Sequence, residues 1–165
     1  LNNGQWFGAF DLIYNRENVK EKCERAIEFF DSAIENYKRA NNKAFYQSLW
    51  DCSELLAESL LLLHNQIKLK APHAVIKKVF REFCDNYNLI YFENHKKISE
   101  IRDNSRYGPP HPKHEDSDLE AVNFLNETHK FLRFVLDFLK ERQVEPSNQK
   151  LKQINVEEID TNSIM

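Results

Sequence analysis

The chain has 165 residues, of which 41% are hydrophobic and 30% charged, and its formal net charge is −3. This composition predicts one compact domain with a substantial core and argues against disorder along most of the chain. The mildly negative charge argues against a strongly basic nucleic-acid module. The longest uncharged apolar run, Leu60–Leu63, is too short to cross a bilayer, so we expect no membrane partner.

Glycine and proline are rare and clustered, which indicates a helical protein. The chain holds three glycines and five prolines, and neither residue occurs within 9–71, 73–107 or 113–145. Such stretches suit helices because an interior glycine costs about 1 kcal/mol and an interior proline about 3 kcal/mol. We therefore predict an all-α, up-and-down bundle of about five helices. The expected segments are an N-terminal extension over 1–14, a helical domain over 15–143 and a polar C-terminal tail over 144–165.

The first two helices are predicted from apolar residues that recur at steps of three and four. In the first helix this stripe covers 19–37, and Asn15 or Asn18 is the expected N-cap. A turn near Asn41 separates it from a second helix, whose broad apolar face covers 45–67. Because the connection is short, we expect the two helices to pack as antiparallel neighbours.

Three further helices are expected in the second half of the chain. Apolar residues over 74–83 predict a short third helix, and a break is expected at 86–88. A thinner apolar pattern over 90–101 predicts the fourth. Ser117 opens the last helix and has a glutamate three residues later, which is the pattern of a capping box.

The cysteines Cys23, Cys52 and Cys84 are an odd number at wide spacing. This pattern argues against a disulfide framework and favours reduced thiols in a cytoplasmic compartment. All three lie on predicted apolar faces, so we interpret them as small core residues and not as nucleophiles.

The predicted connection over 101–114 has the most unusual chemistry in the sequence. It holds four of the eight glycines and prolines, together with two arginines and two histidines. A proline-rich loop loses little entropy when it orders, and an arginine offers a fixed fork to phosphate oxygens. Arg106 and His111 are therefore candidates for cleaving RNA without a metal. The histidine would move a proton at the ribose 2′-oxygen and the arginine would stabilise the more highly charged phosphate. The alternative is that this segment is only a stiff connection between helices.

Arg106 and His111 are separated by four residues, Tyr-Gly-Pro-Pro. This spacing, at the end of one helix and before a long capped helix, resembles the R-x4-6-H motif of the HEPN family. The resemblance covers roughly residues 15–143. It implies a homodimer whose two motifs face each other across a cleft. Active members are metal-independent endoribonucleases, often toxins paired with a small nucleotidyltransferase antitoxin, and inactive members bind nucleotides or act as assembly modules.

Two features depart from the usual HEPN motif. Tyr107 follows the arginine where Asn, Asp or His is common, and the Gly-Pro-Pro segment over 108–110 cannot lie inside a helix. We therefore expect a protein that binds RNA or the phosphate of a nucleotide, with Arg106 and His111 as catalytic residues if it cleaves RNA. Arg102 and Tyr107 are expected to bind beside them. The alternative is a non-catalytic interaction or dimerisation module that binds a nucleotide or a protein partner.

A run of basic residues without acids is a second candidate for phosphate binding, through Lys77, Lys78 and Arg81. The alternative for this run is the solvated face of a helix. His111 and His114 precede two acidic residues, but no third fixed ligand is evident, so we expect no metal and no cofactor. Several aromatic residues offer more apolar surface than one bundle core absorbs, which favours a homodimer: Phe29, Trp50, Tyr91, Phe92, Phe134 and Phe138.

Overall fold

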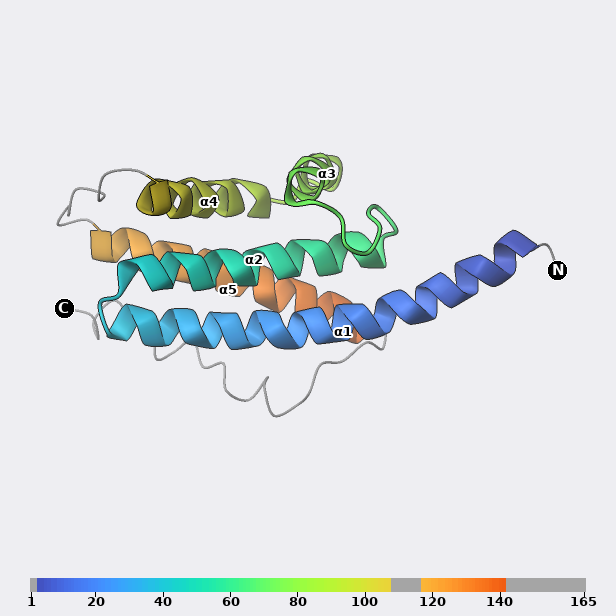
Figure 1. The fold of residues 1–165 in the computed structure, drawn as a ribbon, viewed down its shortest axis with the longest axis horizontal. Helices are drawn as coiled ribbons and strands as arrows, with labels where there is room; N and C mark the ends of the chain where they lie inside the picture. The colour runs from blue at the N-terminus through green and yellow to red at the C-terminus, as the bar shows by residue number, and fades with distance from the viewer. Residues whose placement is uncertain (1–2, 108–116, 142–165) are drawn as a thin grey trace.

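The computed structural model describes residues 3–107 and 117–141, and the side chains of 16–103 and 119–141. Five α-helices account for most of these residues, and the described part of the chain contains no strand (Figure 1). The predicted all-α bundle is therefore confirmed. The helices are α1 (Asn3–Lys38), α2 (Asn42–Leu63), α3 (His73–Asn86), α4 (Tyr91–Tyr107) and α5 (Ser117–Glu141).

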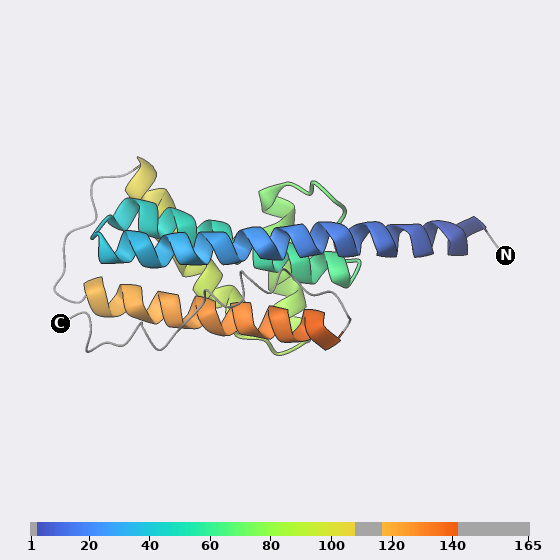
Figure 2. The same cartoon turned by 90° about the horizontal axis from the view of Figure 1, so that it is seen from below.

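Three helices, α1, α2 and α5, run along the long axis of the molecule (Figures 1 and 2). The other two form a second layer: α4 crosses α2 and α5 obliquely, and the short α3 lies across the long axis. α2 contacts each of the other four helices, and it is also the helix with the broadest apolar face. The antiparallel pairing predicted for the first two helices is seen between α1 and α2.

α1 begins earlier than the sequence pattern predicts. The expected N-caps Asn15 and Asn18 both lie inside the helix, which starts at Asn3, so that prediction is wrong. No proline lies between residues 3 and 38 to stop the helix, and an internal asparagine costs only a few tenths of a kcal/mol. The predicted N-terminal extension is thus the first part of α1, and this part projects beyond the other helices (Figure 1).

The turn between α1 and α2 lies where it was expected. Asn41 caps α2, and its side chain accepts a hydrogen bond from the backbone N–H of Ala44 at 3.4 Å. α2 ends at Leu63, before the predicted end at Ile67. There His64 caps the helix, and its backbone N–H and its Nδ1 both lie within hydrogen-bond distance of the Leu60 carbonyl, at 3.2 and 2.8 Å.

Two further sequence predictions need correction. α3 turns Ile76 toward the core and leaves Val75 exposed, although Val75 was assigned to the predicted apolar stripe. α4 continues to Tyr107, since no glycine or proline interrupts it before Gly108. Arg102, Arg106 and Tyr107 therefore lie on a helix, and the expectation that the connection begins at 101 is wrong.

The core of the bundle is apolar and includes all three cysteines, as predicted. Burial raises the pKa of the Cys23 and Cys84 thiols to about 12 and raises that of Cys52 as well, so none is a ready nucleophile. The six aromatic residues that were expected to exceed the capacity of one bundle core all pack in or against this same core. Trp50 and Phe92 are buried in it and the other four are partly buried against it, and the homodimer stays a prediction.

Among the helices that the structure describes, none combines enough length with enough apolar character to cross a bilayer.

Candidate functional site

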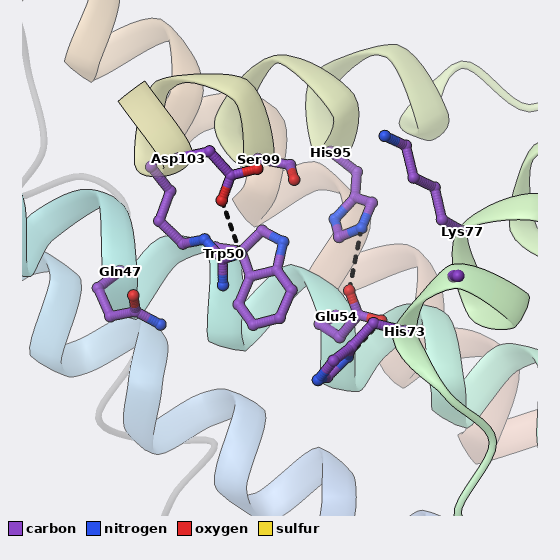
Figure 3. A pocket seen from close by; sticks show the side chains of 10 residues that line it. Gln47, Trp50, Glu54, His73, Lys77, His95, Ser99 and Asp103 are labelled. Carbon is purple, nitrogen blue, oxygen red and sulfur yellow. Dashed lines mark hydrogen bonds and ion pairs between the residues drawn. The ribbon is translucent and has the colours of Figure 1, made fainter. Parts of the chain in front are cut away.

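A pocket of about 440 Å³ opens between α2, the first turns of α3 and α4 (Figure 3). Its side chains follow the helical repeat on each element. Residues 47, 50 and 54 of α2, 73 and 77 of α3, and 95, 99 and 102 of α4 recur at steps of three or four, so each set lies on one helix face. Apart from Ala74, the lining residues are polar or aromatic: Gln47, Trp50, Glu54, His73, Lys77, His95, Ser99, Arg102 and Asp103.

The innermost part of the pocket is a buried carboxylate held by a buried imidazole. Glu54 is 4% exposed and His95 2% exposed. Nε2 of His95 lies 3.3 Å from Oε2 of Glu54, and Nδ1 lies 2.7 Å from Oγ of Ser53. The neutral tautomer that carries its proton on Nε2 satisfies both contacts, since Ser53 can then donate to Nδ1. Ser53 is itself buried, so it orients the ring and is not a nucleophile open to the pocket.

The other carboxylate oxygen of Glu54 has a different environment. Oε1 is buried and accepts no hydrogen bond from the described part of the chain. Its neighbour on α3 is Nδ1 of His73, at 3.6 Å, which is too long for a hydrogen bond. A buried acceptor left without a donor costs about 1–3 kcal/mol, so a donor that reached this oxygen would be stabilising.

A cation and an aromatic ring form the other side of the pocket. The guanidinium carbon of Arg102 lies 3.7 Å from the centroid of the Trp50 ring, which is a cation–π contact. Nη2 of Arg102 also donates to Oδ1 of Asp103 at 2.9 Å. These two contacts hold the guanidinium at the edge of the pocket and reduce the entropy lost when it binds an anion.

The structure brings together two of the basic residues singled out from the sequence. Arg102 and Lys77 both line this pocket, from α4 and α3 respectively. Lys78 and Arg81 are exposed on α3 and do not line it, which matches the solvated helix face considered as the alternative for the basic run.

The predicted catalytic pair falls outside the side chains that the structure describes. Arg106 and Tyr107 belong to the last turn of α4, but their side chains lie outside the described residues. His111 lies outside the described residues altogether, as does His114 of the metal alternative. Across 3–107 and 117–141, no group of three or more His, Cys, Asp or Glu side chains is arranged to hold a metal ion.

Sequence reasoning missed most of the pocket. Trp50 was assigned to an apolar surface, and Glu54, His73 and His95 were given no role. One signal was available, because α2 is buried around much of its circumference and yet carries a glutamate at its middle. A charged residue on such a helix must find polar partners, and this requirement points to a polar site.

The fold and the pocket together define an all-α bundle with a polar, aromatic-walled site between two helical layers. Comparison of the chain with protein-family models, with curated proteins and with solved structures gave no match. Its function is therefore argued from the chemistry of the site.

Proposed function

We propose that this protein binds the phosphate of a nucleotide or of RNA in the pocket between α2, α3 and α4. The main support is that Arg102 and Lys77, from separate parts of the sequence, line the same pocket. A guanidinium offers paired donors to phosphate oxygens and an ammonium adds a mobile positive charge, so together they suit a phosphate group. Trp50 gives the pocket an aromatic wall next to these cations.

The HEPN resemblance points to the same end of the molecule. Arg106 follows Arg102 by one helical turn, so a phosphate chain bound at Arg102 would extend toward the predicted motif. In this proposal Arg106, Tyr107 and His111 extend the phosphate-binding surface. Metal-independent RNA cleavage is its enzymatic form, with His111 as the proton carrier and Arg106 as the cation that stabilises the reacting phosphate.

Calorimetric titration with ATP, GTP and a short RNA at low salt tests the binding proposal. We expect heat from at least one ligand, and Arg102→Gln or Lys77→Gln should weaken that binding about tenfold or more, because each removes a charge-assisted hydrogen bond. Lys78→Gln is the matched control, since Lys78 is exposed on the same helix but does not line the pocket. Absence of heat with every ligand, or an equal loss in the Lys78 variant, contradicts the proposal.

RNA cleavage is tested separately, in the presence of a chelator. The enzymatic form predicts products that end in a 2′,3′-cyclic phosphate, and loss of cleavage in both Arg106→Ala and His111→Ala. Arg81→Ala is the control, because it removes an exposed arginine away from the pocket. If wild-type protein degrades no RNA, the enzymatic form is wrong and phosphate binding is judged on the titrations alone.

A second candidate is a non-catalytic interaction module. It is favoured by two large apolar side chains near the connection from α3 to α4, Tyr87 at 60% exposed and Ile90 at 70% exposed. Exposed apolar residues that lie close together often mark a protein contact. If the protein has this function, titration with a nucleotide or RNA should give no heat, with or without a substitution at Arg102. A charged residue in place of Ile90 should instead weaken association with a protein partner.

A further inference from the structure

Oε1 of Glu54, which accepts no hydrogen bond from the described residues, carries an inference beyond phosphate binding. It is the acceptor of a side chain that is more than nine-tenths buried, and it lies in the wall of the pocket without a hydrogen-bond donor from the described residues. Figure 3 shows Glu54 beneath His95, with Trp50 to its left and the ring of His73 directly below it in this view. A carboxylate in this position calls for a ligand that brings N–H or O–H donors.

The carboxylate is also held in a fixed orientation. Oε2 is engaged by Nε2 of His95, and His95 is oriented in turn by Ser53. The carboxylate is therefore held in one orientation in the pocket wall, which is the usual property of a group that sets ligand specificity. Each carboxylate oxygen has two lone pairs, so Oε2 can accept a second bond beside the one from His95.

The pocket lining offers cations as well as carboxylates to a ligand. Lys77 and Arg102 attract a phosphate, and they line the pocket together with the carboxylates of Glu54 and Asp103. The ligand must then carry donors at one end, for Glu54, and an anion at the other. A nucleotide has this combination, and a pocket of about 440 Å³ is within the range of small-molecule sites.

Among the bases, guanine fits a carboxylate best. It presents two neighbouring donors, N1–H and the 2-amino group, that can meet the two oxygens of one carboxylate. The amino groups of adenine and cytosine stand beside a ring-nitrogen acceptor, and the N3–H of uracil stands between two carbonyls, so each would place a lone pair against Glu54.

We infer that the pocket is a guanine-recognition site, in which Glu54 accepts hydrogen bonds from N1–H and the 2-amino group while Lys77 and Arg102 bind the phosphate. This inference rests on the proposed phosphate binding and adds a base preference to it. The guanine can belong to a free nucleotide or to a single-stranded RNA, which share this chemistry.

Calorimetric titration of the full chain with GMP, IMP, AMP and ribose 5-phosphate tests the inference. We expect GMP to bind about tenfold or more tightly than AMP, and IMP, which lacks the 2-amino group, to lie between them. Two RNAs of equal length, one with and one without guanine, distinguish the two sources. Tighter binding of GMP supports the free nucleotide, and binding of only the guanine-containing RNA supports the RNA.

The outcomes separate this inference from the proposed function. Equal affinities for GMP, IMP and AMP, together with equal affinities for the two RNAs, would overturn the guanine preference and leave phosphate binding in place. No binding of any nucleotide or RNA would remove both.

A variant of the same size tests the role of Glu54 directly. Glu54→Gln places an amide where the carboxylate was, so it should weaken GMP binding about tenfold or more and leave AMP binding nearly unchanged. Glu58→Gln is the matched control, because Glu58 is on the same helix but pairs with Lys22 at 2.8 Å outside the pocket. A Glu54→Gln protein that melts like the wild type and still prefers GMP contradicts the inference. If that variant fails to fold, the comparison of GMP with IMP on the wild-type chain decides it.

Discussion

His129 is the ionisable side chain of α5 most affected by the core. Its ring lies 5.6 Å from that of Phe30, and burial, with a smaller contribution from Arg133, lowers its pKa from 6.5 to about 4. Between these pH values the unfolded chain binds a proton that the folded chain does not bind, so folding loses stability as the pH falls.

This shift predicts a measurable pH dependence. The contribution of His129 to the free energy of unfolding should be fully present above pH 6.5. It should fall by about 1–2 kcal/mol toward pH 4, after allowance for the partial exposure of His129. Urea unfolding at pH 7, 5.5 and 4.5 measures it, and His129→Gln should flatten this part of the curve. Parallel curves for the two proteins would show that His129 is not the cause.

Single residues of the pocket could be predicted only where their chemistry was conspicuous. Arg102 and Lys77 were singled out as candidate phosphate ligands, but Glu54 and His95 were not. The contact between these last two joins α2 to α4 across 41 positions of sequence, and it depends on the angle at which the helices cross. Apolar periodicity predicts which face of a helix is buried, but it does not predict which residues of another helix pack against that face.

At the scale of elements, the turn between α1 and α2 is built on an unusual backbone conformation. Ala40 has φ of 57°, in the left-handed region that favours glycine. The N–H of Asn41 donates to the carbonyl of Asn36 at 2.9 Å, which completes a Schellman-type end of α1 around Ala40.

Ala40→Gly should therefore stabilise the protein by about 0.5–1 kcal/mol, because relief of the left-handed alanine exceeds the extra entropy of glycine in the unfolded chain. Thermal unfolding followed by circular dichroism measures this change. Ala44→Gly is the control and should give no gain, since Ala44 lies in the first turn of α2, where glycine is unfavourable. A loss of stability in Ala40→Gly would contradict the strain at this turn.

The number and type of helices could be predicted because glycine and proline are absent from long stretches, and this absence leaves few alternatives. Boundaries were less predictable, as Asn15, Asn18 and Ile101 show. An asparagine can either cap a helix or lie inside it. Tertiary packing decides between the two, and a short-range sequence pattern carries no information on that packing.

At the scale of the whole molecule, the proposed ribonuclease requires two copies that act together. The HEPN resemblance implies a dimer in which two Arg106–His111 motifs face each other, and Arg106 lies in the last turn of α4. The exposed Ile90 precedes the other end of α4, a helix of 17 residues that spans about 25 Å. These two surfaces are far enough apart to be tested independently.

Light scattering over a range of protein concentrations should give twice the 19.7 kDa mass of the chain if the motif dimerises. Ile90→Lys should leave that mass unchanged, because the charge is added away from the motif. A mass of 19.7 kDa at every concentration would contradict the dimer and require each motif to act alone. Dissociation caused by Ile90→Lys would instead assign the interface to the α3–α4 connection, where Tyr87 is also exposed, and would favour the interaction module over the ribonuclease.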